Sequence, residues 1–267
     1  MGTALLAASL TGLATGLGAV PFFFVRALSR RAYDGVLGLG AGLMMAAATL
    51  GLLGEALAHL HAPGGIELGQ LVLVSLGFVA GVGVAVAMDR LIPHRHAGGH
   101  HQHLGHEPGH DHHDPVPELR RGYAVVGALS LHRVPEGLAI GAGFAMDSGS
   151  GANLGWLLAV AIGIQNVCEG VVMAAPLRQG GVSPGRGLLV VTLTGLVIPL
   201  GAIIGQMLAS VAVLAMPFVL SLAAGTLIYI TSNEIIPESH SHGHEGTASS
   251  GVAAGFLLTM LLQALLR

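Results

Sequence analysis

The chain has 267 residues, of which 52% are hydrophobic and only 9% are charged, and its formal net charge is −3. A soluble globular domain carries roughly 25% charged residues, so this chain lacks the polar surface that water requires. The composition excludes an ordinary water-soluble protein and predicts one all-helical domain, residues 1–267, embedded in a lipid bilayer.

Long apolar runs predict eight membrane-spanning helices, because a run of more than about 18 apolar residues can cross the hydrocarbon core. Most connections are short. The exception is the segment 93–121, which is rich in His, Gly and Pro and is expected to be disordered, since it cannot bury a core. The predicted spans are 3–25, 35–58, 68–88, 122–146, 152–176, 187–209, 211–237 and 250–266.

The arginines predict the orientation of the chain. All eleven basic residues are Arg, and nine of them lie in the connections after the first, third and fifth spans. Connections that are rich in Arg stay in the cytoplasm, so both termini are predicted to face out. Two histidine-rich segments, 94–113 and 240–244, are then cytoplasmic.

Acidic and histidine side chains gather at the outer end of the second span. Two interpretations are equally weighted: an entrance funnel for cations, or a solvated helix end. The residues are Glu55, His59 and His61.

The long connection between the third and fourth spans holds nine histidines within twenty residues. Such a density predicts loose metal binding, and buffering, sensing and delivery are all compatible with it. The residues are His94, His96, His100, His101, His103, His106, His110, His112 and His113.

Two chemically matched motifs lie near the middle of the fourth and fifth spans, LHRVPEG at 131–137 and QNVCEG at 165–170. In each, a metal-capable residue precedes a glutamate by four positions, about one helical turn, so His132 and Glu136 share a face, as do Gln165 and Glu169. Ionisable side chains at this depth usually mark an ion or substrate pathway.

An imidazole nitrogen, two carboxylates and an amide oxygen form a mixed nitrogen and oxygen donor set. That set suits zinc, and also iron, manganese, cobalt or nickel, without selecting among them. The alternative is a structural ion pair, in which Arg133 neutralises a glutamate.

The paired motifs resemble the ZIP (Zrt/Irt-like protein) family of divalent metal transporters, in its bacterial branch. AGLM at 41–44, DRLIPH at 89–94 and SNEIIPE at 232–238 are also similar to family motifs. The resemblance implies an eight-helix bundle with both termini outside, and a two-metal site between spans 4, 5 and 6. It implies that the first metal position uses His132, Glu136, Gln165, Asn166 and Glu169. The exit-side candidates are Asp89, Asn233, Glu234, Glu238, His240 and His244. The alternative is that these are the polar residues that amphipathic helix ends routinely carry.

Three residues depart from the family pattern, and all three belong to the second metal position. Arg133 stands where the family has Asn, Asn166 where it has Asp, and Ile198 where it has Glu. Two carboxylates are lost, and a permanently charged guanidinium is added. We hypothesise that Arg133 takes the place of the second metal and leaves a mononuclear site.

The leading interpretation is a carrier, not an enzyme, that moves Zn²⁺ into the cytoplasm across a bacterial inner membrane. Cd²⁺, Fe²⁺, Mn²⁺ and Co²⁺ remain alternative substrates. The expected partners are metal ions and lipid but no nucleic acid, and a homodimer is left open. The rival interpretations are a non-transporting metal-binding sensor or inactive homologue, and an intramembrane metal-dependent hydrolase.

Overall fold

The computed structural model describes residues 1–58, 61–62, 65–66, 68–91, 115–150, 153–211 and 216–266. His59 and the nine loop histidines lie outside these ranges. The regular structure within them is helical apart from one antiparallel pair of two-residue strands, β1 (His61–Ala62) and β2 (Gly65–Ile66), in which His61 is paired with Ile66.

The helices confirm the predicted membrane fold. Seven described helical segments are long and apolar enough to cross a membrane, and α5, with 36 residues, runs among them. The elements are α1 (Gly2–Leu17) followed by η1 (Val20–Phe23); α2 (Arg30–Ala46) continued by the π-helix η2 (Ala47–Leu53) and α3 (Gly54–Ala58); α4 (Leu68–Leu91); α5 (Pro115–Ser150); α6 (Leu154–Gln179); α7 (Pro184–Gly195); α8 (Val197–Val211); α9 (Met216–Ile230) continued by the π-helix η4 (Thr231–Ile235) and α10 (Ile236–Ser239); and α11 (Glu245–Leu266).

Several predicted boundaries differ from the structure, and two of the differences are the following. The span 187–209 is divided at Leu196 into α7 and α8, because Pro199 has no N–H to donate to the carbonyl of Gly195 and its ring crowds that carbonyl. The connection 93–121 ends earlier than expected, since α5 begins at Pro115. Residues 115–121 thus belong to α5, and the rest of the segment predicted to be disordered lies outside the described residues.

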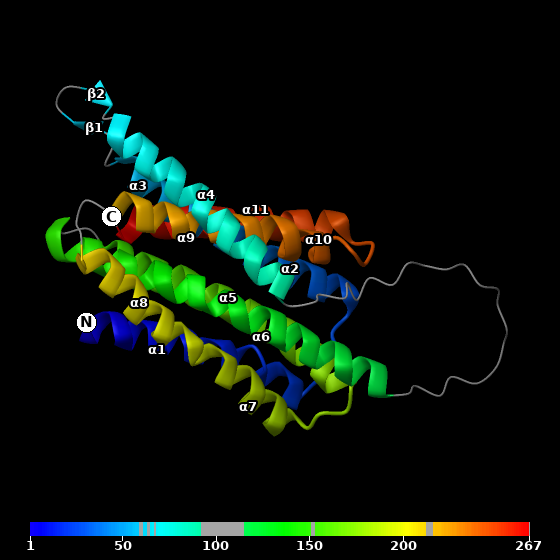
Figure 1. Ribbon diagram of the computed structural model, residues 1–267. Helices are drawn as coiled ribbons and strands as arrows, with labels where there is room; N and C mark the ends of the chain where they lie inside the picture. The colour runs from blue at the N-terminus through cyan, green and yellow to red at the C-terminus, as the bar shows by residue number, and fades with distance from the viewer. Residues whose placement is uncertain are drawn as a thin grey trace.

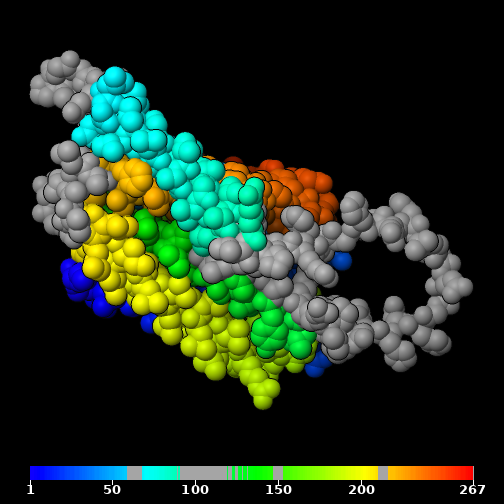
Figure 2. Space-filling model, in the orientation of Figure 1, coloured from blue at the N-terminus to red at the C-terminus, as the bar shows by residue number. Residues whose placement is uncertain are grey.

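The bundle is arranged around α5 and α6, which lie side by side (Figure 1). Helices α1, α7 and α8 pack on one side of this pair, and α2, α4, α9 and α11 lie on the other. Figure 2 shows α4 as an outer ridge of the molecule. Only 22% of the membrane-spanning stretch of α4 is buried, and only 11% of that of α11. These two helices therefore present apolar side chains outward, as helices in contact with lipid do. Both marked chain ends lie at the same end of the bundle (Figure 1).

Glycines let neighbouring helices approach closely along several seams. A methyl group added at Gly42 of α2 would lie 2.0 Å from the carbonyl oxygen of Val252 in α11, and one added at Gly81 of α4 would lie equally close to that of Leu222 in α9. Small residues at helix contacts are the usual way in which membrane helices pack in lipid.

The Gly42→Ala variant is expected to unfold more easily than the wild type, because α2 and α11 must separate to accept the methyl group. Overpacking of this kind costs typically about 1–3 kcal/mol. The matched control is Gly83→Ala, on α4, where nothing lies within 4 Å of the added atom. Thermal unfolding in detergent should show a lower midpoint for Gly42→Ala alone. Equal midpoints for the two variants would contradict the close seam.

Candidate metal centre

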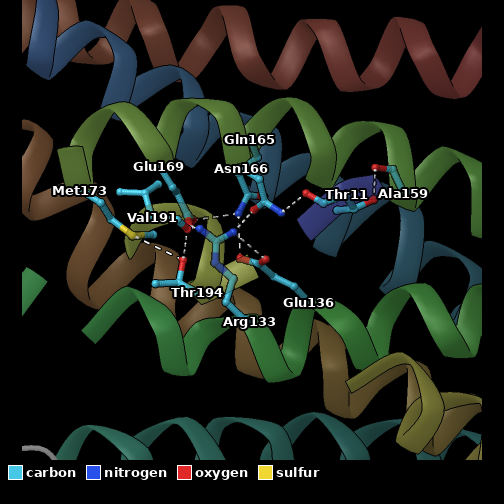
Figure 3. A network of polar contacts seen from close by, with 10 residues as sticks. All are labelled: Thr11, Arg133, Glu136, Ala159, Gln165, Asn166, Glu169, Met173, Val191 and Thr194. Atoms are coloured by element: carbon cyan, nitrogen blue, oxygen red, sulfur yellow. Dashed lines mark hydrogen bonds and ion pairs between the residues drawn. The ribbon is translucent and has the colours of Figure 1, made fainter. Parts of the chain in front are cut away.

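A buried polar network lies between α5 and α6, at the two predicted motifs. It joins Arg133 and Glu136 of α5 to Gln165, Asn166 and Glu169 of α6, as Figure 3 shows. All five side chains are buried. The packing of α5 on α6 therefore brings both glutamates to one place.

The guanidinium of Arg133 lies between the two carboxylates. Its Nη1 donates to Glu136 Oε2 at 3.2 Å and also to the Oδ1 of Asn166. Its Nη2 forms an ion pair with Glu169 Oε2 at 3.0 Å. A buried charge is tolerated when partners of opposite charge surround it in this way. One fixed cation thus already links the two carboxylates that were predicted to hold a metal.

The amide of Gln165 also connects the two glutamates. Its Nε2 donates to Glu136 Oε1 at 3.2 Å and to Glu169 Oε1 at 3.0 Å. Its Oε1, the atom that could bind a metal, is buried and has no hydrogen-bond partner among the described residues. Gln165 therefore keeps a free acceptor directly beside two carboxylates.

Helix α1 supports the network from outside the two motifs. Asn166 Nδ2 donates to the carbonyl oxygen of Thr11 at 3.1 Å, and Thr11 Oγ1 donates to the carbonyl oxygen of Ala159 at 3.0 Å. The part that Thr11 plays in the network could not be predicted from the sequence, because the backbone carbonyl that accepts from Asn166 could come from any residue. Asn166 consequently acts here as a link between Arg133 and α1.

Replacing Asn166 by Ala should destabilise the protein by roughly 1–3 kcal/mol, since it removes a buried acceptor from Arg133 and a buried donor from Thr11. Asn153→Ala is a suitable control, because Asn153 makes one exposed hydrogen bond, to the carbonyl oxygen of Leu266. The check is thermal unfolding in detergent. An unchanged midpoint for Asn166→Ala would mean that the α1 link contributes little.

His132 departs from the predicted ligand set. Its Nε2 lies 3.4 Å from Glu234 Oε1, on the π-helix η4, and its Nδ1 is buried without a hydrogen-bond partner among the described residues. Among the described residues, no hydrogen bond or ion pair joins His132 to the guanidinium network. The five predicted first-position residues are thus divided between two places, four around Arg133 and one beside Glu234.

Ile198 is fully buried at the contact between α8 and α5. Its carbonyl oxygen lies against Gly137, where an added methyl would approach to 2.1 Å. The third helix of the implied two-metal site therefore contributes an aliphatic residue, and its backbone lies against Gly137, the residue that follows Glu136.

The remaining predicted residues lie away from the network. Glu55 is half-buried on α3, Glu238 is half-buried on α10, and Asn233 is exposed. Only the backbone of His61 and of Asp89 is described. His240 has Nδ1 2.9 Å from the carbonyl oxygen of Ile236 and Nε2 3.0 Å from Ser249 Oγ, while His244 lies beside Asp34.

Within the described ranges, no three His, Cys, Asp or Glu side chains are grouped closely enough to hold a metal ion. The central network explains this for the two glutamates, because Arg133 lies between them. A divalent ion entering here would have to displace the guanidinium from at least one carboxylate.

Comparison with known proteins matches the chain to a family of transporters. The family model described as "ZIP Zinc transporter" matches residues 88–263. The chain is 35% identical to zinc transporter GufA of Myxococcus xanthus, over 98% of both chains. It is 38% identical to zinc transporter ZIPB of Bordetella bronchiseptica, over 98% of this chain and 81% of the relative. It is also 29% identical to human zinc transporter ZIP11, over 97% and 96% of the two chains.

Proposed function

This chain belongs to the ZIP zinc transporter family, and from that premise we propose that it carries a divalent transition metal, zinc first, into the cytoplasm across a bacterial inner membrane. The names of its relatives support zinc as the substrate. The nine arginines in the connections after the first, third and fifth spans support an orientation with both termini outside.

The observation that carries this proposal is the buried donor set on α5 and α6. Glu136 and Glu169 are acidic, fully enclosed and linked by Gln165, whose Oε1 is unpaired among the described residues. Burying two carboxylates is costly without a cation, so such a pair is suited to attract one. Carboxylate and amide oxygens, with the nearby imidazole of His132, fit zinc and similar ions.

The position of Arg133 supports a site that binds one ion. The guanidinium contacts Glu136, Asn166 and Glu169 together, and Ile198 brings no charge from α8. A guanidinium stays protonated under any physiological condition, so a second divalent ion beside it would meet repulsion. Metal analysis of purified protein, from which metal bound to the loop histidines has been removed, should find one ion at the centre. Two tightly bound central ions would refute this part of the proposal.

The contact between His132 and Glu234 supports a path toward the cytoplasmic side. An imidazole nitrogen and a carboxylate oxygen 3.4 Å apart could pass an ion from the centre toward η4. A π-helix often marks a functional position within a longer helix. Glu238, Asp89, Asn233, His240 and His244 remain candidate exit-side ligands, and Glu55, His59 and His61 remain candidates at the entrance.

The direct test is zinc uptake into proteoliposomes that contain the purified protein. Saturable uptake that depends on the protein would support the carrier. Zinc binding without uptake would instead favour a sensor or an inactive homologue. Uptake of Cd²⁺, Fe²⁺, Mn²⁺ and Co²⁺ in the same vesicles would define the range of substrates.

A further inference from the structure

A second polar cluster joins the beginning of α2 to the turn between α10 and α11. It consists of Asp34, which is fully buried, and of His242 and His244. More than two hundred positions of sequence separate the carboxylate from the histidines. Among the described residues, no hydrogen bond or ion pair joins any of the three to the Arg133 network.

Each oxygen of the Asp34 carboxylate faces one imidazole. Oδ1 lies 2.8 Å from His242 Nδ1, a hydrogen-bond distance. Oδ2 lies 3.3 Å from His244 Nδ1, and neither of these two atoms has a hydrogen-bond partner among the described residues. Two ligand atoms of a tetrahedral zinc ion, each about 2.0–2.1 Å from the metal, are roughly 3.3 Å apart. The unpaired oxygen and nitrogen therefore have the separation of two zinc ligands.

The surroundings hold this geometry in place. Tyr33 packs edge-on against the ring of His242, with ring centres 5.6 Å apart. Gly243 has a φ of 84°, a conformation that glycine adopts without strain, and this turn lets both flanking histidines reach Asp34. A histidine that holds the second oxygen of a ligating carboxylate is a common way of orienting a metal ligand.

The charge of the cluster also calls for a cation. A buried carboxylate needs a positive partner, and the neighbouring Arg31 directs its Nε to Thr247 Oγ1 at 3.2 Å. The His244 side chain is 36% exposed, so its ring lies at the surface of the cluster, with Nδ1 turned inward toward Asp34.

We propose that Asp34 Oδ2 and His244 Nδ1 bind a divalent transition metal ion, with His242 orienting the carboxylate and water completing the coordination. Two protein ligands give weak, exchangeable binding. The site is distinct from the central network, and the proposal does not depend on transport.

The test is labelling of histidines by diethylpyrocarbonate in the purified full-length protein, read residue by residue by mass spectrometry during a titration with zinc. Zinc should slow the labelling of His244. In Asp34→Asn, the zinc concentration that gives half protection should rise about tenfold or more, because a ligand charge is lost. Glu245→Gln removes the same charge from an exposed neighbour and should leave that concentration unchanged.

Protection of the loop histidines without protection of His244 would overturn the proposal and leave the cluster as an ion pair that fastens α2 to α11. If Asp34→Asn is not monodisperse, His244→Gln provides the second variant. Zinc should slow the labelling of His242 in the wild type, where His242 holds the ligating carboxylate, and should not slow it in His244→Gln. Protection of His244 should persist in Glu169→Gln, so a failure of the transport proposal and a failure of this one can be told apart.

Discussion

Zinc uptake by the Glu169→Gln variant is expected to fall by about a hundredfold or more, since loss even of an outer partner of a metal ligand costs 10–100-fold. Glutamine preserves the shape of the side chain and removes its charge. Arg133 and Gln165 both contact Glu169 at 3.0 Å, which is shorter than the 3.2 Å of their contacts with Glu136. The measurement is the initial rate of zinc uptake into proteoliposomes with equal amounts of protein.

Glu245→Gln is the matched control for this experiment. It makes the same chemical change at an exposed position in the first turn of α11, outside every proposed metal position. Its uptake should equal that of the wild type. If Glu169→Gln also transported zinc at the wild-type rate, the central carboxylates would not form the transport site.

Replacing Arg133 by Asn should destabilise the zinc-free protein by about 3–5 kcal/mol, the usual consequence of removing one partner from a buried ion pair. Glu136 and Glu169 would then share one enclosed site with no cation between them. Zinc should bind more tightly to this variant, because it no longer competes with the guanidinium. Thermal unfolding with and without zinc measures both effects, and zinc should raise the midpoint more in the variant than in the wild type.

Arg133→Lys separates the charge of the arginine from its shape. Lysine keeps the positive charge but lacks the planar fork that contacts two carboxylates and an amide together. Its stability without zinc should lie between those of the wild type and Arg133→Asn. Should Arg133→Asn unfold at the wild-type temperature and bind zinc no more tightly, the arginine would not be the internal counter-ion of this site.

The membrane helices were predictable because each requires a long apolar run, and such a run can be recognised within one continuous stretch of the sequence. The division at Leu196 was also signalled locally, by Pro199, whose missing N–H weakens the helix one turn earlier. The start of α5 at Pro115 was not, since the histidine-rich composition before it masks the change. Proline is well tolerated at the first turn of a helix, so Pro115 is compatible with the helix start that the structure shows.

The central site was predictable only within each helix. Four-residue spacing placed Gln165 beside Glu169 on one face of α6, where the two side chains are hydrogen-bonded. The pairing of His132 with Glu234 depends on how α5 meets the π-helix η4, which no spacing within a single helix reveals. The same holds for Asp34 and His242, whose sequence contexts give no sign of each other.

The guanidinium between the carboxylates has a consequence for membrane voltage. With both glutamates ionised, Arg133 leaves the empty site with one negative charge, and a bound zinc ion gives it one positive charge. If the site moves across the electric field, a potential that is negative inside favours both the inward step of the loaded form and the outward return of the empty form. Each step then gains up to about 2.3 kcal/mol per 100 mV. Without the arginine, the loaded site would be neutral, and only the return step would respond to voltage.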